Sequence, residues 1–155
     1  FMNILAVDPG IVNYGWAVVD FHTAELVDYG IQNVRQGGSD VETVDDIIEL
    51  LRGIVDRHQP RFFLIENQGQ SMLLRGIEMA SIATMKMLGV KTKVVHAITI
   101  KTHFKSRGLG CRGNRQNKLD AEQLVGALGY GAQVSHVADC ILMCVYMLEC
   151  VNRQN

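Results

Sequence analysis

The chain has 155 residues, of which 48% are apolar and 20% are charged, with a formal net charge of −1. This composition is typical of one globular domain and excludes a disordered, collagen-like or linker-rich chain. The chain does not open with a charged region followed by an apolar segment, and no uninterrupted apolar stretch reaches the roughly 18 residues of a spanning helix, so we expect no signal peptide and no membrane anchor.

Phe1, which precedes Met2, is interpreted as a cloning or processing remnant, and a single domain is expected over residues 2–155. The first part of this domain predicts three antiparallel strands. Residues 3–8 and 14–20 are short apolar runs rich in strand-forming residues, and a Pro-Gly pair between them favours a hairpin. Residues 25–34 continue as a third strand.

Helices and strands alternate after this point. From residue 41 to residue 58 the apolar positions follow the spacing of a one-faced helix, which Pro60 ends. Residues 62–67 form a continuous apolar run, which is typical of a strand buried on both faces.

A second helix is expected over 71–88, rich in Met, Ala and Ile and closed by Gly89. A fifth strand follows at 92–97, then a helix at 121–128 and a last helix at 137–151 that is apolar nearly all round. This order predicts an α/β fold, a mixed five-stranded sheet with three antiparallel strands first and helices on both faces.

The basic residues are concentrated in one stretch. Between Lys86 and Lys118 there are nine basic residues and no acidic one, whereas the rest of the chain carries 6 basic and 16 acidic residues. This segregation predicts a surface that binds a polyanion, although a solvated basic loop is the alternative. The glycine-punctuated part, residues 106–118, is typical of a flexible loop that wraps phosphates. The candidate contacts are Lys101, Lys105, Arg107, Arg112, Arg115 and Lys118.

The cysteines give information about the compartment. No two of them form a Cys-x-x-Cys pair, which disfavours a structural zinc site. They are interpreted as reduced thiols of an intracellular protein. The four residues are Cys111, Cys140, Cys144 and Cys150.

Four side chains able to bind a metal stand at the ends of predicted buried elements. Asp8 ends the first strand, Glu66 ends the apolar strand, and His136 and Asp139 share one face at the start of the last helix. If the two strands are neighbours, the carboxylates of Asp8 and Glu66 emerge side by side. Oxygen ligands of this kind suit Mg²⁺ or Mn²⁺, and two such ions about 4 Å apart can hydrolyse a phosphodiester.

Each of these residues also has a structural interpretation. Asp8 before Pro-Gly can be a turn residue, and Glu66 can make a hydrogen bond to a neighbouring loop. Ser135 can be the N-cap of the last helix and Asp139 a favourable acid in its first turn. His136 alone can equally be structural.

An ordered set of motifs resembles the Holliday-junction resolvases of the RuvC type, with the poxvirus-type resolvases as a similar branch. The motifs are ILAVDPGIVNYGWAVVD, the strand ending in LIENQ, Lys118 entering a helix after a basic loop, and HVAD opening the last helix. The resemblance covers nearly the whole chain and implies the ribonuclease H-like superfold. It also implies an intracellular, cytoplasmic endonuclease, at cytoplasmic replication sites if viral, which makes paired nicks in branched DNA.

The resemblance implies roles for individual residues. Asp8, Glu66 and Asp139 match metal-binding acids of the family, with Asp8 bridging two Mg²⁺ or Mn²⁺ ions. His136 stands where many members have an acid, and Ser135 stands where some viral members have a second acid. Because these two acids are replaced, the second metal site differs from the family pattern. Imidazole is also a competent ligand or proton carrier.

Two further roles follow from the same resemblance. Lys118 matches a basic residue near the scissile phosphate, where it would stabilise the charge that develops in the transition state. Family members are homodimers, and the helical stretch 74–88 has more apolar surface than one sheet face needs, so the dimer seam is expected there. Ordinary core packing is the alternative for this helix.

Other functions use related patterns. A ribonuclease H cutting RNA–DNA hybrids places a glutamate on its first helix, but Glu49 lies off the apolar face of that helix. An actin-like or sugar-kinase ATPase needs a second, duplicated domain that 155 residues cannot supply. A DNA-structure-binding module without catalysis, which retains Asp8 and Glu66 as relics, is distinguished from the enzyme by metal-dependent cleavage.

Overall fold

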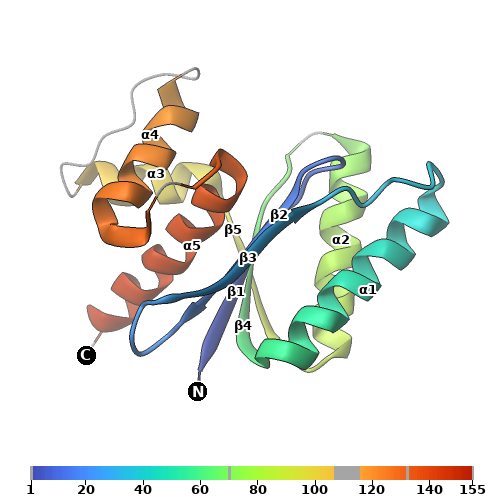
Figure 1. Ribbon diagram of the computed structural model, residues 1–155, viewed down its shortest axis with the longest axis horizontal. Helices are drawn as coiled ribbons and strands as arrows, with labels where there is room; N and C mark the ends of the chain where they lie inside the picture. Colours follow the sequence, from blue (N-terminus) through green and yellow to red (C-terminus); the bar gives the residue numbers. More distant parts are fainter. Residues whose placement is uncertain (1, 70, 107–115, 132, 155) are drawn as a thin grey trace.

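The computed structural model describes residues 2–69, 71–106, 116–131 and 133–154, with the backbone only for 106 and 116–120. A five-stranded sheet runs through the middle of the molecule in the order β3-β2-β1-β4-β5 and separates two layers of helices (Figure 1). The expected α/β architecture, a mixed sheet with helices on both faces, is confirmed.

The sheet is antiparallel on one side of β1 and parallel on the other. β1 (Asn3–Asp8) pairs with β2 (Tyr14–Asp20), and β2 pairs with β3 (Leu26–Gln32), both antiparallel. On its other edge β1 pairs parallel with β4 (Pro60–Glu66), which pairs parallel with β5 (Lys91–Val95). The strands β1 and β4 are therefore neighbours, as the expected site requires.

In the described part of the chain, helices cover both faces of the sheet (Figure 1). α1 (Asp40–His58) and α2 (Met72–Met87) lie on the first face. On the second face lie α3 (Ala97–Ser106), α4 (Gln116–Val125) and α5 (Ser135–Asn152). A π-helical turn, η1 (Gly126–Tyr130), follows α4 directly.

Alternation along the strands divides the core in two. Leu5 and Val7 of β1 pack with α1 and α2, whereas Ile4 and Ala6 pack on the side of α5. The same alternation in β4 places Phe63 on the first face and Leu64 on the second, and strands with two buried faces need such continuous apolar runs.

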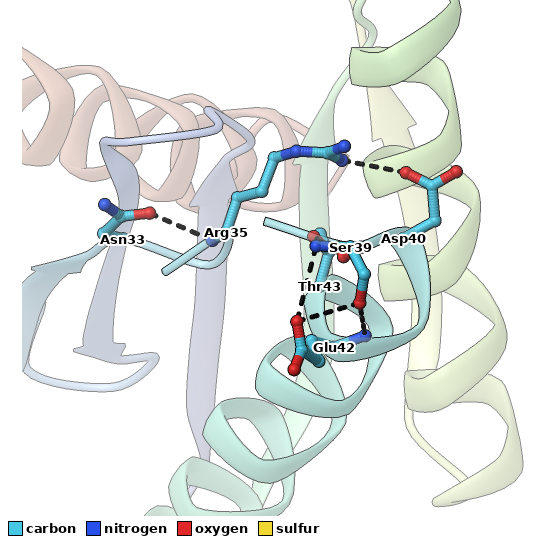
Figure 2. A network of polar contacts seen from close by, with 6 residues as sticks. All are labelled: Asn33, Arg35, Ser39, Asp40, Glu42 and Thr43. Atoms are coloured by element: carbon cyan, nitrogen blue, oxygen red, sulfur yellow. Dashed lines mark hydrogen bonds and ion pairs between the residues drawn. The ribbon is translucent and has the colours of Figure 1, made fainter. Parts of the chain in front are cut away.

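The start of α1 is fixed by its own sequence. The Ser39 side chain accepts a hydrogen bond from the Glu42 backbone at 3.1 Å, and Glu42 accepts one in return from the Ser39 backbone (Figure 2). This capping box satisfies two of the amides that a helix start leaves without partners. Arg35 reaches across to Asp40 at 2.9 Å (Figure 2).

The structure adds one helix that the sequence analysis did not predict. α3 begins directly after β5, inside the stretch interpreted only as basic, and β5 ends at Val95 rather than at 97. The helix expected at 121–128 begins earlier, at Gln116, and changes to the π-helical turn at Gly126. The other predicted elements are present with ends shifted by a few residues.

The sequence analysis expected no uninterrupted apolar stretch of the length of a spanning helix, and in α5 the apolar sequence is interrupted by Asp139 and Glu149. A less strict test asks only whether a helix is long enough and apolar enough on average to cross a membrane. Within the described residues this one helix meets that test by length and composition, and half of it is buried inside the structure. Its contacts with β1 and β2 are those of a core helix.

Candidate active site

Asp8 and Glu66 lie side by side at the ends of two adjacent parallel strands. The register pairs Val7 with Ile65, so the next position on each strand brings the two acids together. Alternation along the strands turns both side chains toward α5. The predicted pairing at one sheet edge is thus present in the structure.

The first turn of α5 approaches this pair closely because β2 has a glycine where the two meet. A Cβ at Gly15 would lie 2.9 Å from the Cβ of His136, a distance that side chains do not adopt. With glycine there, His136 Nδ1 lies 3.2 Å from Asp8 Oδ2. The His136 side chain is 30% exposed and that of Asp8 15%, so the contact is partly shielded from water.

The residue that precedes α5 is Val134, which makes no side-chain cap. The interpretation of Ser135 as an N-cap is therefore wrong, because Ser135 is already the first helical residue. Ser135 instead lines the cavity beside the acids, together with His136 and Asp139.

A cavity of about 470 Å³ opens over the paired acids. It brings together all four of the predicted metal-binding side chains, Asp8, Glu66, His136 and Asp139. The sequence analysis missed two other parts of the wall, His96 directly after β5 and the loop 67–69 that follows β4. The motif LIENQ includes the first two residues of this loop, so the sequence could have indicated it, but the sequence analysis assigned these two residues no role.

The two neighbouring acids influence each other's ionisation, because a negative charge on Asp8 makes ionisation of Glu66 less favourable. Burial, and after it the negative charge of Asp8 and a hydrogen bond to Asp8, together raise the pKa of Glu66 to about 8. The positive charges of Lys101 and His136 oppose this shift. Glu66 therefore holds a proton at neutral pH, when the site contains only protein groups.

Lys101 lies on the wall of the site, on a helix that the sequence did not reveal. It lines a smaller cavity of about 140 Å³ together with Glu66 and Asp139. His103 on the same helix pairs with Glu149 of α5 and packs edge-on against Tyr146, so α3 is held against α5. This docking keeps the Lys101 ammonium near the acids.

The donor set fits a hard divalent cation. In the described part of the chain, no group of three His, Cys, Asp and Glu side chains forms a ready metal site as it stands. The carboxyl oxygens of Asp8, Glu66 and Asp139 around this cavity are the kind of ligand that Mg²⁺ and Mn²⁺ prefer.

Part of the expected basic surface is described by the structure. Lys101 and Lys105 are exposed on α3. Lys118 lies within α4, where only the backbone is described. Arg107, Arg112 and Arg115 lie outside the described residues.

Comparison with known proteins gives short sequence matches and a long structural one. No family model matches the chain. The chain is 33% identical over 67 residues to the crossover junction endodeoxyribonuclease RuvC of Prochlorococcus marinus (strain MIT 9313). This match covers 42% of the chain and 44% of the relative, so the chain spans less than half the length of the curated relative it matches.

The structural likeness extends over almost the whole chain. Thermus thermophilus RuvC superposes with a TM-score of 0.76 at 18% identity, covering 98% of this chain and 97% of that one. The fowlpox virus Holliday junction resolvase gives a TM-score of 0.68 at 14% identity, covering 96% and 99%. The expected ribonuclease H-like fold of the RuvC-type and poxvirus resolvases is confirmed.

Proposed function

We propose that this chain is a metal-dependent DNA endonuclease that resolves four-way Holliday junctions by paired nicks. The observation that carries the proposal is the convergence of Asp8 and Glu66 with His136 and Asp139 in one cavity. Proteins with the same fold, Thermus thermophilus RuvC and the fowlpox virus resolvase, have structures in complex with Holliday junction DNA. Their substrate is the one we assign to this chain.

We propose that Asp8, Glu66, Asp139 and His136 would hold Mg²⁺ or Mn²⁺, with two ions per site. Such ions, when bound, would supply an activated water and stabilisation of the leaving oxygen of a phosphodiester. Glu66 must release its proton to coordinate a cation, and His136 must be neutral because a protonated imidazole offers no lone pair.

The protein's own cations have a separate task. Lys101 stands beside Glu66 and Asp139 on the cavity wall, where its ammonium can hold a phosphate oxygen against the acids. Lys118 is proposed to stabilise the charge that develops at the scissile phosphate. His96 at the cavity mouth can donate a hydrogen bond to the backbone of the bound strand.

The basic stretch is the proposed DNA-binding surface. Lys101 and Lys105 are exposed on α3, which leads away from the cavity, and Arg107, Arg112 and Arg115 follow them in the sequence. Phosphate contacts of this kind act through release of counterions, so they supply affinity without sequence preference. We propose branched DNA as the partner. Paired nicks need two active sites that act on opposite strands of the same junction.

The second active site is proposed to come from another copy of the chain. A groove of about 430 Å³ runs between α1 and α2, with Val44, Leu73 and Ala80 among its lining residues. Nearby Met72 and Met79 are 91% and 55% exposed. The seam expected at 74–88 therefore has an apolar surface that a homodimer would bury.

The cysteines support a reducing compartment. Cys140 and Cys144 are buried free thiols, and Cys150 is a partly buried one. We propose that the protein works inside the cell, in the cytoplasm, or at cytoplasmic replication sites if it is viral.

Two other functions remain as outcomes of the test. A ribonuclease H would need an acid of the first helix in the site, but Glu49 is exposed on α1, across the sheet from α5. A non-catalytic DNA-structure-binding module would bind junctions without cutting them.

The deciding experiment incubates the protein with a labelled four-way junction, a matched linear duplex and an RNA–DNA hybrid, with Mg²⁺ or with EDTA. We expect Mg²⁺-dependent cutting of the junction alone, at paired positions on opposite strands. Cleavage of the hybrid in preference to the junction would assign the ribonuclease H function. Junction binding without cleavage in Mg²⁺ or Mn²⁺ would assign the binding module.

A further inference from the structure

A buried carboxylate on α2 holds the loop that follows the active-site strand. The Glu78 side chain is 3% exposed and faces the end of β4. Its Oε2 accepts a hydrogen bond from the Gln68 backbone N–H at 3.1 Å, and its Oε1 accepts one from Asn67 Nδ2 at 3.4 Å. Arg75, one turn earlier on α2, places a guanidinium nitrogen 3.9 Å from the same carboxylate.

The loop that Glu78 holds is also closed on itself and on the sheet. The Asn67 backbone N–H donates to the Val95 carbonyl at 2.9 Å, and Asn67 Oδ1 accepts from the Gly69 backbone at 3.2 Å. The Gln68 side-chain amide donates to the Glu66 carbonyl at 3.1 Å. Through these bonds the residue that carries the active-site carboxylate is tied to the loop, and the loop is tied to Glu78.

We propose that Glu78 is a positioning residue of the candidate active site. By fixing Asn67 and Gln68, Glu78 sets the orientation of the Glu66 side chain at the end of β4. It also holds the loop 67–69, one wall of the cavity, in place. Groups that orient ligands through hydrogen bonds matter to metal affinity and to activity although they touch neither metal nor substrate. The activity part of this inference rests on the proposed function.

The competing role is purely structural, with Glu78 serving only to dock α2 on the sheet. The chain offers a matched control for that role one turn further along the same helix. Ser81 and Tyr14 share a fully buried hydrogen bond of 2.7 Å between their hydroxyl groups. Tyr14→Phe removes this bond, while the Ser81 hydroxyl keeps its bond to the Ile77 carbonyl at 2.8 Å.

The experiment compares wild type, Glu78→Gln, Glu78→Asp and Tyr14→Phe. For each protein it measures thermal stability, amide hydrogen exchange at Gln68, Mn²⁺ binding by electron paramagnetic resonance without DNA, and kcat and KM on the junction. In Glu78→Gln the side chain offers one acceptor and turns its NH₂ toward the other donor. In Glu78→Asp the charge stays but the reach is one methylene shorter.

We expect both Glu78 variants to exchange the Gln68 amide faster, to bind Mn²⁺ about 10-fold more weakly and to lose about 10-fold in kcat with little change in KM. Tyr14→Phe should lose comparable thermal stability and leave Gln68 exchange, Mn²⁺ affinity and kcat near wild type.

Wild-type exchange at Gln68 in Glu78→Gln would overturn the proposal, as would Mn²⁺ binding no weaker than that of Tyr14→Phe. Wild-type behaviour of Glu78→Asp would also overturn it, because the buried charge rather than its reach would then be the cause. A wild-type protein that binds junctions and cuts none contradicts the proposed function instead, while exchange and Mn²⁺ binding still decide the role of Glu78.

Discussion

Glu66 makes the folded protein sensitive to pH between the two values at which its carboxyl group titrates. Its pKa is raised from 4.5 to about 8 in the folded state by burial and by Asp8. Between these values the folded protein holds a proton that the unfolded chain has lost. Folding stability is therefore highest below pH 4.5 with respect to this group, and it falls as pH rises to about 8.

We expect the free energy of unfolding in EDTA to fall by on the order of a few kcal/mol between pH 5 and pH 8. Glu66→Gln, which cannot ionise, should flatten this part of the profile. Mg²⁺ should raise the melting temperature more at pH 8 than at pH 5, because it competes with the proton for the same oxygens. Urea unfolding at three pH values measures the effect, and an equal slope in wild type and Glu66→Gln would contradict it.

Asp8 has no substitute among the described groups of the site, since it faces both Glu66 and His136. Asp8→Asn keeps the shape and removes the charge, so cleavage of a four-way junction should fall to near background. Binding in EDTA should survive or tighten slightly, because one negative charge beside the phosphates is gone. Gel shift in EDTA and strand cleavage in Mg²⁺ on one junction provide the measurement.

Cleavage by Asp8→Asn at the wild-type rate would rule out the two-metal mechanism. Loss of binding together with an unfolded circular dichroism spectrum would show instead that Asp8 is a structural turn residue.

At the scale of elements, the contact between α5 and β2 depends on the missing side chain of Gly15. Gly15→Ala would place a Cβ 2.9 Å from that of His136, so the first turn of α5 must move away from the sheet. We expect a loss of about 1–3 kcal/mol in stability and a loss of cleavage, because His136 and Asp139 move with the helix.

The control for this prediction is Gly53→Ala in the middle of α1, where the nearest atom to a new Cβ is the end of the Arg57 side chain at 3.4 Å. Alanine favours a helix interior over glycine, so this variant should gain about 0.5–1 kcal/mol and cut junctions normally. If a destabilised Gly15→Ala protein cut junctions at the wild-type rate, the close contact between α5 and β2 would not be required for cleavage.

The elements also show where sequence patterns carry enough information and where they do not. The strands were predictable because each has apolar residues at consecutive or alternate positions, and Asp8 and Glu66 stood out as acids ending such runs. α3 was not, because it has few buried positions, with Ile100 and Phe104 buried and Ile98 69% exposed. A helix with so narrow an apolar stripe leaves little periodicity to read.

The sequence was sufficient to predict the acids of the candidate site, but not the residues that hold them in place. That β1 and β4 are neighbours is a property of sheet topology, which the sequence analysis could state only as a condition. The burial of Glu78 gave no signal, since a glutamate between apolar residues of a helix usually faces solvent. The close approach at Gly15 likewise depends on a helix that lies far away in the sequence.

At the scale of the whole molecule, paired nicks require two sites, and the α1–α2 groove is the proposed seam. Gly76 lines this groove, and a Cβ there would meet no atom within 4 Å, so a side chain fits without disturbing the monomer. Gly76→Glu should even favour the α2 helix, while it places a charge in an apolar seam, where desolvation makes it costly. Val27→Glu, at a 45% exposed position of β3 outside both the groove and the stretch 74–88, adds the same charge and is the matched control.

We expect wild type and Val27→Glu to sediment at twice the 17.2 kDa chain mass and Gly76→Glu to sediment as a folded monomer. On a plasmid with an extruded cruciform, coupled nicks by a dimer give linear product, whereas uncoupled nicks by a monomer give open circles. Gly76→Glu should therefore shift the product toward open circles, with binding to a single arm retained. If the Gly76→Glu protein remained dimeric and still linearised the plasmid, the dimer seam would lie elsewhere on the molecule, because a buried charge in the groove would have disrupted a seam located there.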